Sequence, residues 1–282
     1  MMKHIPVLLD AVMDTIGDIN GARVLDATFG AGGYSRAFLN AGATVVAFDR
    51  DPNVISDADE LTNQYGDKFT FIPNTFSNMQ SLQDTFDAIV FDLGMSSMQI
   101  DTPERGFSFR TNAPLDMRMS ENGPTIRDMF NVWSAQDLTR ILRDYGDVKP
   151  AAAIAKSIKE QTPNTTFELK NLIYNPRDVA PVFQALRIAL NDEMGELKTA
   201  LAAVPKLLKP NGRCICVTFH SLEDRIVKKA FRDLTKPDGD PRLPIATIPA
   251  FRLLKTRLPD DAEIKRNPRA RSAHMRAVVK SY

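Results

Sequence analysis

Short apolar segments that alternate with helical patterning dominate the first third of the chain. Four of these segments, bounded by turn residues, cover residues 23–28, 44–49, 69–72 and 86–92. Strands that are apolar along their whole length are typical of a parallel sheet covered by helices on both faces. The alternation therefore predicts an α/β fold, with a helix over residues 34–40 after the first strand.

The pattern changes after this first third. Residues 103–133 are rich in Pro, Gly, Asn and Met and show no clear period. Helical patterning then covers residues 134–145, 151–161, 166–173 and 181–208. A strand pattern returns only at residues 213–219, after a Pro-Asn-Gly turn.

An α/β core interrupted by a helical insert accounts for this order of elements. We assign residues 1–102 and 209–282 to the core and residues 103–208 to the insert. In the second part of the core, residues 235–270 are expected to form an extended or partly mobile arm, because Pro, Asp and Lys are frequent there. A last strand is expected at residues 277–281.

Charge is unevenly distributed along a chain that is almost neutral overall. From residue 204 onward the sequence has 18 Lys and Arg against 8 Asp and Glu, a net charge of +10. The remainder has 18 Lys and Arg against 27 Asp and Glu, a net charge of −9. The C-terminal part either faces a polyanion or forms a solvated basic surface, and the charge count does not separate the two.

The composition is that of a folded protein without a membrane segment. No run of about 18 apolar residues is present, and residues 1–6 lack the long apolar stretch of a signal peptide. Cys214 and Cys216 are expected to be small buried side chains, and no metal site is predicted. These features predict a cytoplasmic protein, or one of an organelle matrix if the source is eukaryotic.

A glycine-rich turn, Asp26-Ala-Thr-Phe-Gly30-Ala-Gly32-Gly33, follows the first predicted strand. Glycines let the backbone turn tightly and approach a ligand, and the next helix offers N–H groups to it. Asp49 ends the second strand about 20 residues further on, where a carboxylate can accept hydrogen bonds from ribose hydroxyls. The two features indicate a nucleoside-containing cofactor, although Asp49 could also be a surface or capping carboxylate. The G-x-G-x-x-G spacing of dinucleotide-binding loops is absent.

A second polar segment, Asp92-Leu-Gly-Met-Ser-Ser-Met-Gln99, follows the fourth predicted strand. Ligands of open α/β sheets bind at the carboxyl ends of the strands. Asp92 could there accept hydrogen bonds from an amino group of a cofactor or substrate. Ser97 could in principle be a hydrolase nucleophile, but the G-x-S-x-G elbow is absent.

With these motifs the sequence resembles the RsmH (MraW) family of S-adenosylmethionine-dependent methyltransferases, which act on N4 of a cytosine in small-subunit ribosomal RNA. The resemblance extends over nearly the whole chain. Its stretches are His4–Asp10, Asp26–Gly33, Phe48–Pro52, Asp92–Gln99, Glu104–Phe109, Pro114–Met119, Phe183–Ile188, Thr218–Ile226 and Asn267–Ser272.

The resemblance implies a class I methyltransferase sheet that carries S-adenosylmethionine, with the helical insert recognising the substrate. By position it assigns the cofactor site to Gly30, Gly32, Gly33, Tyr34, Asp49, Phe76, Asp92 and Gln99. In this assignment Asp49 binds the ribose, the glycines admit the methionine moiety and Phe76 packs on the adenine.

Two positions depart from the family pattern. Family members usually have His at the position of Tyr34, which is harmless if only the backbone N–H contacts the cofactor. A Pro-Ala-Thr-Arg-like run usually precedes Phe183, and this chain has Pro181 where that Arg is expected. Arg177 could substitute for it from a shifted register.

Three residues are candidates for handling the cytosine amine. Asp92, Asp116 and His220 could orient it or accept its proton, and Asp92 could also be a cofactor ligand alone. His220 could equally be a packing residue. Ser221 is expected to cap a helix with Asp224 as its partner.

RNA contacts are expected from both parts of the chain. Phe107 and Phe109 either stack on a base or fill the core of the insert, and Arg187 lies in a family motif. Arg269 and Arg271 could contact phosphates, or could belong to a solvated arm.

The sequence thus predicts a methyltransferase whose partner is small-subunit ribosomal RNA or the assembling small subunit. A small-molecule or protein methyltransferase fits less well, because of the long insert and the basic C-terminal part. A non-catalytic ribosome-assembly factor of the same fold is the alternative, and the departure from the family pattern over Pro176–Val182 gives it some support. The sequence does not decide whether the protein forms a homodimer.

Overall fold

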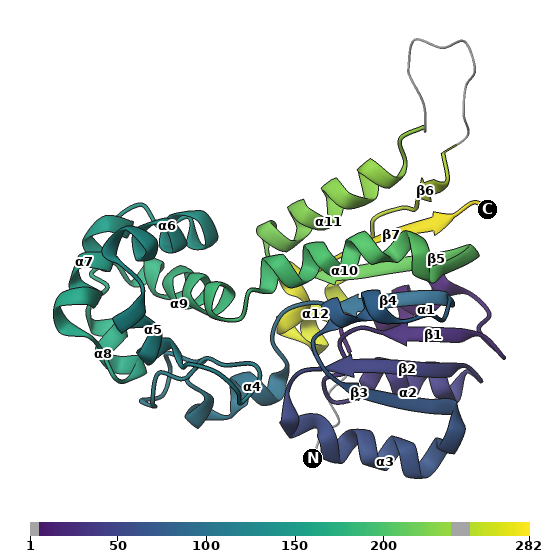
Figure 1. Ribbon diagram of the computed structural model, residues 1–282, viewed down its shortest axis with the longest axis horizontal. Coiled ribbons are helices and arrows are strands. Elements are labelled where there is room, and N and C mark those ends of the chain that lie inside the picture. The colour runs from purple at the N-terminus through teal and green to yellow at the C-terminus, as the bar shows by residue number, and fades with distance from the viewer. Residues whose placement is uncertain (1–5, 238–248) are drawn as a thin grey trace. The chain divides into compact units, whose positions relative to one another are not determined.

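The computed structural model describes residues 6–237 and 249–282. Its residues divide into two compact units (Figure 1). The sheet unit comprises Met1–Gly94 and Met194–Tyr282, and the helical unit comprises Met95–Glu193. The start of the His4 motif and residues 238–248 of the predicted arm lie outside the described residues.

A seven-stranded sheet forms the first unit, in the order β3-β2-β1-β4-β5-β7-β6. Strands β1 to β5 are parallel, β7 is antiparallel to β5, and β6 is antiparallel to β7. Their bounds are β1 Arg23–Asp26, β2 Thr44–Asp49, β3 Phe69–Pro73, β4 Phe86–Asp92, β5 Leu208–Thr218, β6 Phe251–Leu253 and β7 His274–Lys280. The predicted α/β fold is therefore confirmed.

An interior position in the sheet explains why the segments of β2 and β4 are apolar throughout. The interior of β2, Val45 to Phe48, is buried on both faces, and so is the interior of β4, Ala88 to Phe91. Cys214 and Cys216 are buried, unpaired cysteines of β5, as expected. Strand β5 begins five residues before the predicted strand, because Leu208 already pairs with Phe86 across an irregularity in the ladder.

Helices of the sheet unit cover the sheet. Helices α2 and α3 contact β1, β2 and β3, while α10 and α11 supply apolar side chains to a core shared with β1, β2, β4 and β5. Figure 1 shows α10 and α11 running along the sheet. The bounds are α1 Leu9–Ile16, α2 Gly33–Asn40, α3 Ile55–Tyr65, α10 Glu193–Leu207 and α11 Ser221–Leu234.

The helical unit packs around a second apolar core. Leu115, Phe130, Leu142, Ile158 and Leu186 are among its fully buried members. Side chains fix where the helices begin: Thr125 and Ser134 start capping boxes with acidic residues three positions later. The helices are α4 Ser97–Asp101, α5 Ile126–Val132, α6 Ala135–Gly146, α7 Ala151–Gln161, α8 Thr166–Asn171 and α9 Pro176–Leu190.

The predicted helix over residues 181–208 is in fact two helices. Helix α9 ends at Leu190, and Asp192 adopts a left-handed backbone conformation with φ of 47° before α10 begins. The side chain of Asn191 holds the break, since its amide donates to the carbonyl oxygens of Met117 and Arg187 at 2.9 Å. Periodicity did not reveal this break because apolar residues continue on both sides of it.

The boundaries of the helical unit consequently differ from those of the predicted insert, which covered residues 103–208. It begins at Met95 and ends at Glu193. Helix α10 belongs to the sheet unit, because Leu197, Leu201 and Leu207 pack in the core of the sheet.

The predicted arm contains regular structure. Strand β6 pairs with β7, and α12, Asp261–Arg266, precedes a short 3₁₀ helix, Pro268–Ser272. The carboxylate of Glu263 accepts a hydrogen bond from the Leu8 amide at 2.5 Å, which joins α12 to the beginning of the described chain. Strand β7 starts three residues before the predicted last strand. Among the described residues, no helix is both long and apolar enough to cross a bilayer.

The position of α10 can be tested by its contribution to stability. Leu201→Ala should lower the free energy of unfolding by about 2–5 kcal/mol, because it leaves a cavity in a packed core. Lys198→Ala removes an exposed side chain of the same helix and should change it by less than about 0.5 kcal/mol. Denaturant unfolding followed by circular dichroism measures both; equal effects would place α10 outside the core.

Candidate functional site

Three carboxylates lie at one edge of the sheet. Asp26, Asp49 and Asp92 are the last residues of β1, β2 and β4, and these strands are neighbours in the order β2-β1-β4. Because the strands are parallel, their carboxyl ends meet at the edge where ligands of open α/β sheets bind.

Asp26 is the most buried of the three, and it was not among the predicted site residues. Its carboxylate accepts hydrogen bonds from the Ser35 hydroxyl at 2.6 Å and the Thr28 amide at 3.2 Å. Burial raises its pKa to about 6, although these two hydrogen bonds oppose the shift. A carboxylate that ends a fully apolar strand is the signal that could have identified it.

Two further hydrogen bonds tie the loop after β1 to the neighbouring strands. The Thr28 hydroxyl accepts from the Asp92 amide at 2.7 Å, and one oxygen of Asp49 accepts from the Gly30 amide at 2.7 Å. The other Asp49 oxygen accepts from the Asp51 amide at 2.9 Å. Burial raises the pKa of Asp49 above its ordinary value, and each of its oxygens keeps room for a further donor.

Asp92 has an unsatisfied acceptor. Its Oδ1 is buried and has no hydrogen-bond partner among the described residues. Burial raises its pKa well above the ordinary value, and the nearby carboxylates of Asp26 and Glu223 add to the shift. A buried polar atom without a partner costs free energy, so this oxygen suits a ligand that brings a donor or a positive charge.

The glycine loop leads directly into α2. Gly32 precedes the helix with φ of 73°, and no side chain caps the first turn. At Gly33 a Cβ would clash with the ring of Pro6, so the segment before α1 requires a glycine here. The uncapped N–H groups of the first turn can bind an anionic or polar ligand group.

The Tyr34 side chain points into the protein. It is buried, stacks on Phe38 and donates a hydrogen bond from its hydroxyl to the carbonyl of Val7. Only the backbone of Tyr34 is therefore available in the loop, which makes the replacement of the usual His compatible with cofactor binding.

Phe76 begins a 3₁₀ helix after β3 and is partly buried. Its ring contacts Phe91 of β4 edge-on, with ring centroids 5.8 Å apart. This packing fixes one edge of the ring, and the partial exposure leaves apolar surface for an adenine.

The junction of β5 and α11 differs from the prediction. His220, not Ser221, is the N-cap residue of α11, and Glu223 is its capping partner. The buried Glu223 carboxylate accepts from the amides of Phe219 at 2.8 Å and His220 at 3.3 Å. Asp224, the predicted partner of Ser221, instead accepts two hydrogen bonds from Arg276.

The His220 ring is oriented by this cap. Its Nδ1 accepts from the Glu223 amide at 3.4 Å, which leaves the proton of a neutral ring on Nε2. Nε2 is buried, and although it lies 2.9 Å from the Glu223 carboxylate, the direction is wrong for a hydrogen bond. His220 therefore offers a donor that the described residues leave unsatisfied.

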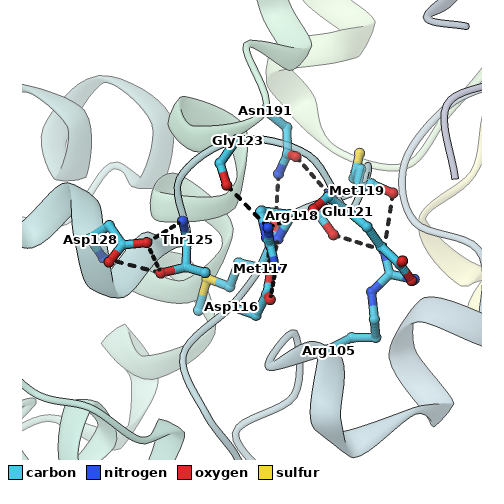
Figure 2. Close-up of polar contacts among 10 residues, drawn as sticks. All are labelled: Arg105, Asp116, Met117, Arg118, Met119, Glu121, Gly123, Thr125, Asp128 and Asn191. Carbon is cyan, nitrogen blue, oxygen red and sulfur yellow. Dashed lines mark hydrogen bonds and ion pairs between the residues drawn. The ribbon is translucent and has the colours of Figure 1, made fainter.

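Gln99 and Asp116 belong to the helical unit. Gln99 is buried and completes a capping box of α4, in which its side-chain oxygen accepts from the Ser96 amide at 3.1 Å. Asp116 forms a two-pronged ion pair with Arg118, with N–O distances of 2.8 and 2.6 Å (Figure 2). Burial opposes ionisation of Asp116, but the hydrogen bonds from Arg118 outweigh it and hold the pKa below its ordinary value.

The loop around Asp116 is held by further polar contacts (Figure 2). Arg105 donates to the carbonyl oxygens of Arg118 and Met119 at 2.8 and 3.0 Å. Asn191 accepts from the Met119 amide at 2.8 Å and donates to the carbonyl of Met117, whose φ is 61°. The Asp116 carboxylate is thus a structural member of an ordered loop, in addition to any role toward a substrate.

Two predicted RNA contacts are at odds with the structure. Arg187 is buried, and its guanidinium binds both oxygens of Glu193 at 2.7 and 2.9 Å, so it does not reach a phosphate. Phe107 is also buried and belongs to the core of the helical unit. Phe109 is partly buried against Phe183, with ring centroids 5.4 Å apart.

Arg269 and Arg271 are exposed on the 3₁₀ helix that follows α12. In the helical unit, Pro181 lies inside α9, and its carbonyl packs closely against Gly146. Arg177 is exposed in the first turn of α9, one turn before the position where the family usually has Arg.

The sheet edge fits a nucleoside cofactor that carries amino and carboxylate groups. Asp49 can accept from ribose hydroxyls, the first turn of α2 can bind a carboxylate, and the unsatisfied Asp92 Oδ1 can accept from an amino group.

Comparison with known proteins agrees with this geometry. Residues 1–281 match the MraW methylase family. "Ribosomal RNA small subunit methyltransferase H" of Sinorhizobium medicae (strain WSM419) is 43% identical over 300 residues, covering 99% of this chain and 88% of that protein. The protein of the same name from Gluconobacter oxydans (strain 621H) is 44% identical, covering 98% and 93%.

Among solved structures, an rRNA methylase from Streptococcus thermophilus aligns with 12% identity and a TM-score of 0.47, covering 100% of this chain and 99% of that one. The sequence match over the whole length decides the assignment. The chain belongs to the MraW methylase family, and its sheet unit has the class I S-adenosylmethionine-dependent methyltransferase fold.

Proposed function

We propose that the protein transfers a methyl group from S-adenosylmethionine to the exocyclic N4 of a cytosine in the decoding region of small-subunit ribosomal RNA. The observation that carries the proposal is the carboxylate edge of the sheet, where Asp49 and Asp92 flank the glycine loop. The full-length similarity to relatives named for ribosomal RNA methylation supports the choice of substrate.

The cofactor is held mainly by the sheet unit in this proposal. The backbone of Gly30, Gly32, Gly33 and Tyr34 receives the methionine part, while Asp49 binds the ribose and Phe76 packs on the adenine. Asp92 accepts from an amino group. For Gln99, the family motif that it ends is the only support for a cofactor contact. The bound cofactor supplies an electrophilic methyl group.

The chain's own residues must overcome the weak nucleophilicity of the cytosine amine, whose lone pair is delocalised into the ring. Asp92 Oδ1 is an acceptor that can orient the amine or take its proton, whereas His220 Nε2–H is a donor for a ring acceptor of the base. Asp116 is the third candidate, and its pairing with Arg118 favours a positioning role for it. The target base must leave any stack to reach Asp92 or His220.

The assembling small subunit in the cytoplasm is the proposed partner. Arg269 and Arg271 are exposed and can contact its phosphates, and the partly buried Phe109 is the remaining candidate for a stacking contact.

Methyl transfer tests the proposal directly. Small-subunit RNA from a strain without this enzyme, incubated with the protein and tritiated S-adenosylmethionine, should gain label in N4-methylated cytidine. Nucleoside chromatography with mass spectrometry identifies the product. Tight binding of the RNA without transfer would instead support a non-catalytic assembly factor, and label in another base would exclude the proposed target atom.

The ribose contact is tested by Asp49→Ala. It should weaken binding of S-adenosylmethionine by about 1.5–3 kcal/mol, because hydrogen bonds to a charged group are lost. Asp59→Ala removes the same charge from the exposed side of α3 and should leave the affinity unchanged. Isothermal titration calorimetry measures both, and a folded Asp49 variant of normal affinity would remove this residue from the cofactor site.

A further inference from the structure

Helix α11 extends from the candidate site along the sheet, with one buried and one exposed face. Glu223, Val227 and Phe231 face the core at intervals of four residues. Arg225, Lys228 and Arg232 are exposed at intervals of three and four residues, so they lie along one solvent-facing stripe. We refer to these three residues as the α11 cationic stripe.

The acidic residues of α11 form their hydrogen bonds and ion pairs outside the stripe. Glu223 is buried in the helix cap. Asp224 binds Arg276, which holds the pKa of this carboxyl below its ordinary value, and Lys228 of the stripe adds a smaller attraction without forming an ion pair. Asp233 pairs with Lys229 and Lys236 at 3.2 and 2.6 Å. Within residues 6–237 and 249–282, the three cations of the stripe form no ion pair.

The neighbouring edge of the sheet extends the positive charge. Strand β6 is the edge strand and contacts α11. Arg252 on β6, followed by Lys255 and Arg257, is exposed. No large exposed apolar side chain lies on α11, which is described throughout, so this helix lacks the apolar centre of a protein-docking surface; on the adjoining strand β6, Leu253 is exposed.

We propose that the α11 cationic stripe, together with Arg252, binds phosphates of the RNA that flanks the target nucleotide. The inference rests on the proposed function and adds a surface to it. Helix rise places the three stripe residues over about 10 Å along the axis, a length of about three phosphate spacings along one helical strand. Because His220 begins the same helix, the stripe leads away from the candidate site.

The test is the salt dependence of RNA binding. In the triple variant Arg225→Gln, Lys228→Gln, Arg232→Gln, affinity for small-subunit RNA should fall about tenfold to a hundredfold near 0.15 M salt. The slope of log affinity against log salt should flatten by about two to three units. Filter binding over a series of salt concentrations measures both quantities.

A matched variant controls for net charge. Arg140→Gln, Arg143→Gln, Lys156→Gln removes three exposed cations of the helical unit, each of which has a carboxylate partner. This variant should retain the wild-type slope. Arg225→Lys with Arg232→Lys keeps the charge and should also bind as the wild type, and thermal unfolding verifies that all variants are folded.

The outcomes separate this inference from the proposed function. If the wild type methylates the RNA and both triple variants have the wild-type slope of log affinity against log salt, the stripe is a solvated face and the inference fails. If the wild type binds with the predicted stripe dependence but transfers no methyl group, the proposed activity fails and the RNA surface stands. If the stripe variant binds the RNA with lower affinity but an unchanged salt slope, the lost contact is not electrostatic, and this result would also overturn the inference.

Discussion

The hydrogen bonds around the buried Asp26 carboxylate hold the first loop of the sheet in place. Ser35 of α2 and the amide of Thr28 both donate to it, and the Thr28 hydroxyl then accepts from the Asp92 amide. These contacts connect the end of β1 to the start of α2 and to the end of β4. If the buried Asp26 carboxylate lost these hydrogen bonds, its burial would oppose the folding of the loop that forms the candidate site.

The same edge contains carboxylates with different tasks. Asp49 is engaged by two backbone amides and keeps lone pairs for a ligand, whereas Asp92 has one buried oxygen without a partner. Burial raises the cost of ionising Asp92, and repulsion from the neighbouring carboxylates adds to it. An edge with more carboxylate acceptors than donors is better suited to a ligand that brings amino donors than to one that is purely anionic.

The sequence was sufficient for the sheet and for the edge that binds ligands, because continuous apolar strands and the residues that end them are local signals. It was not sufficient for features that depend on distant partners. The burial of Arg187 depends on Glu193 and on a break between two helices that Asn191 stabilises. The helix cap at His220 lies one residue before the predicted cap. The prediction chose Ser221 because serine is a usual N-cap residue and histidine is an uncommon one.

The most direct measurement of the central claim is a carboxyl titration of Asp92 by ¹³C NMR, with the signal assigned through Asp92→Asn. The account predicts a pKa well above the ordinary aspartate range in the free protein, because the carboxyl is buried beside Asp26 and Glu223. Saturating S-adenosylhomocysteine should lower this pKa, since an amino donor on the ligand favours the charged carboxylate. Tight binding of the ligand with an unchanged Asp92 titration would contradict the account.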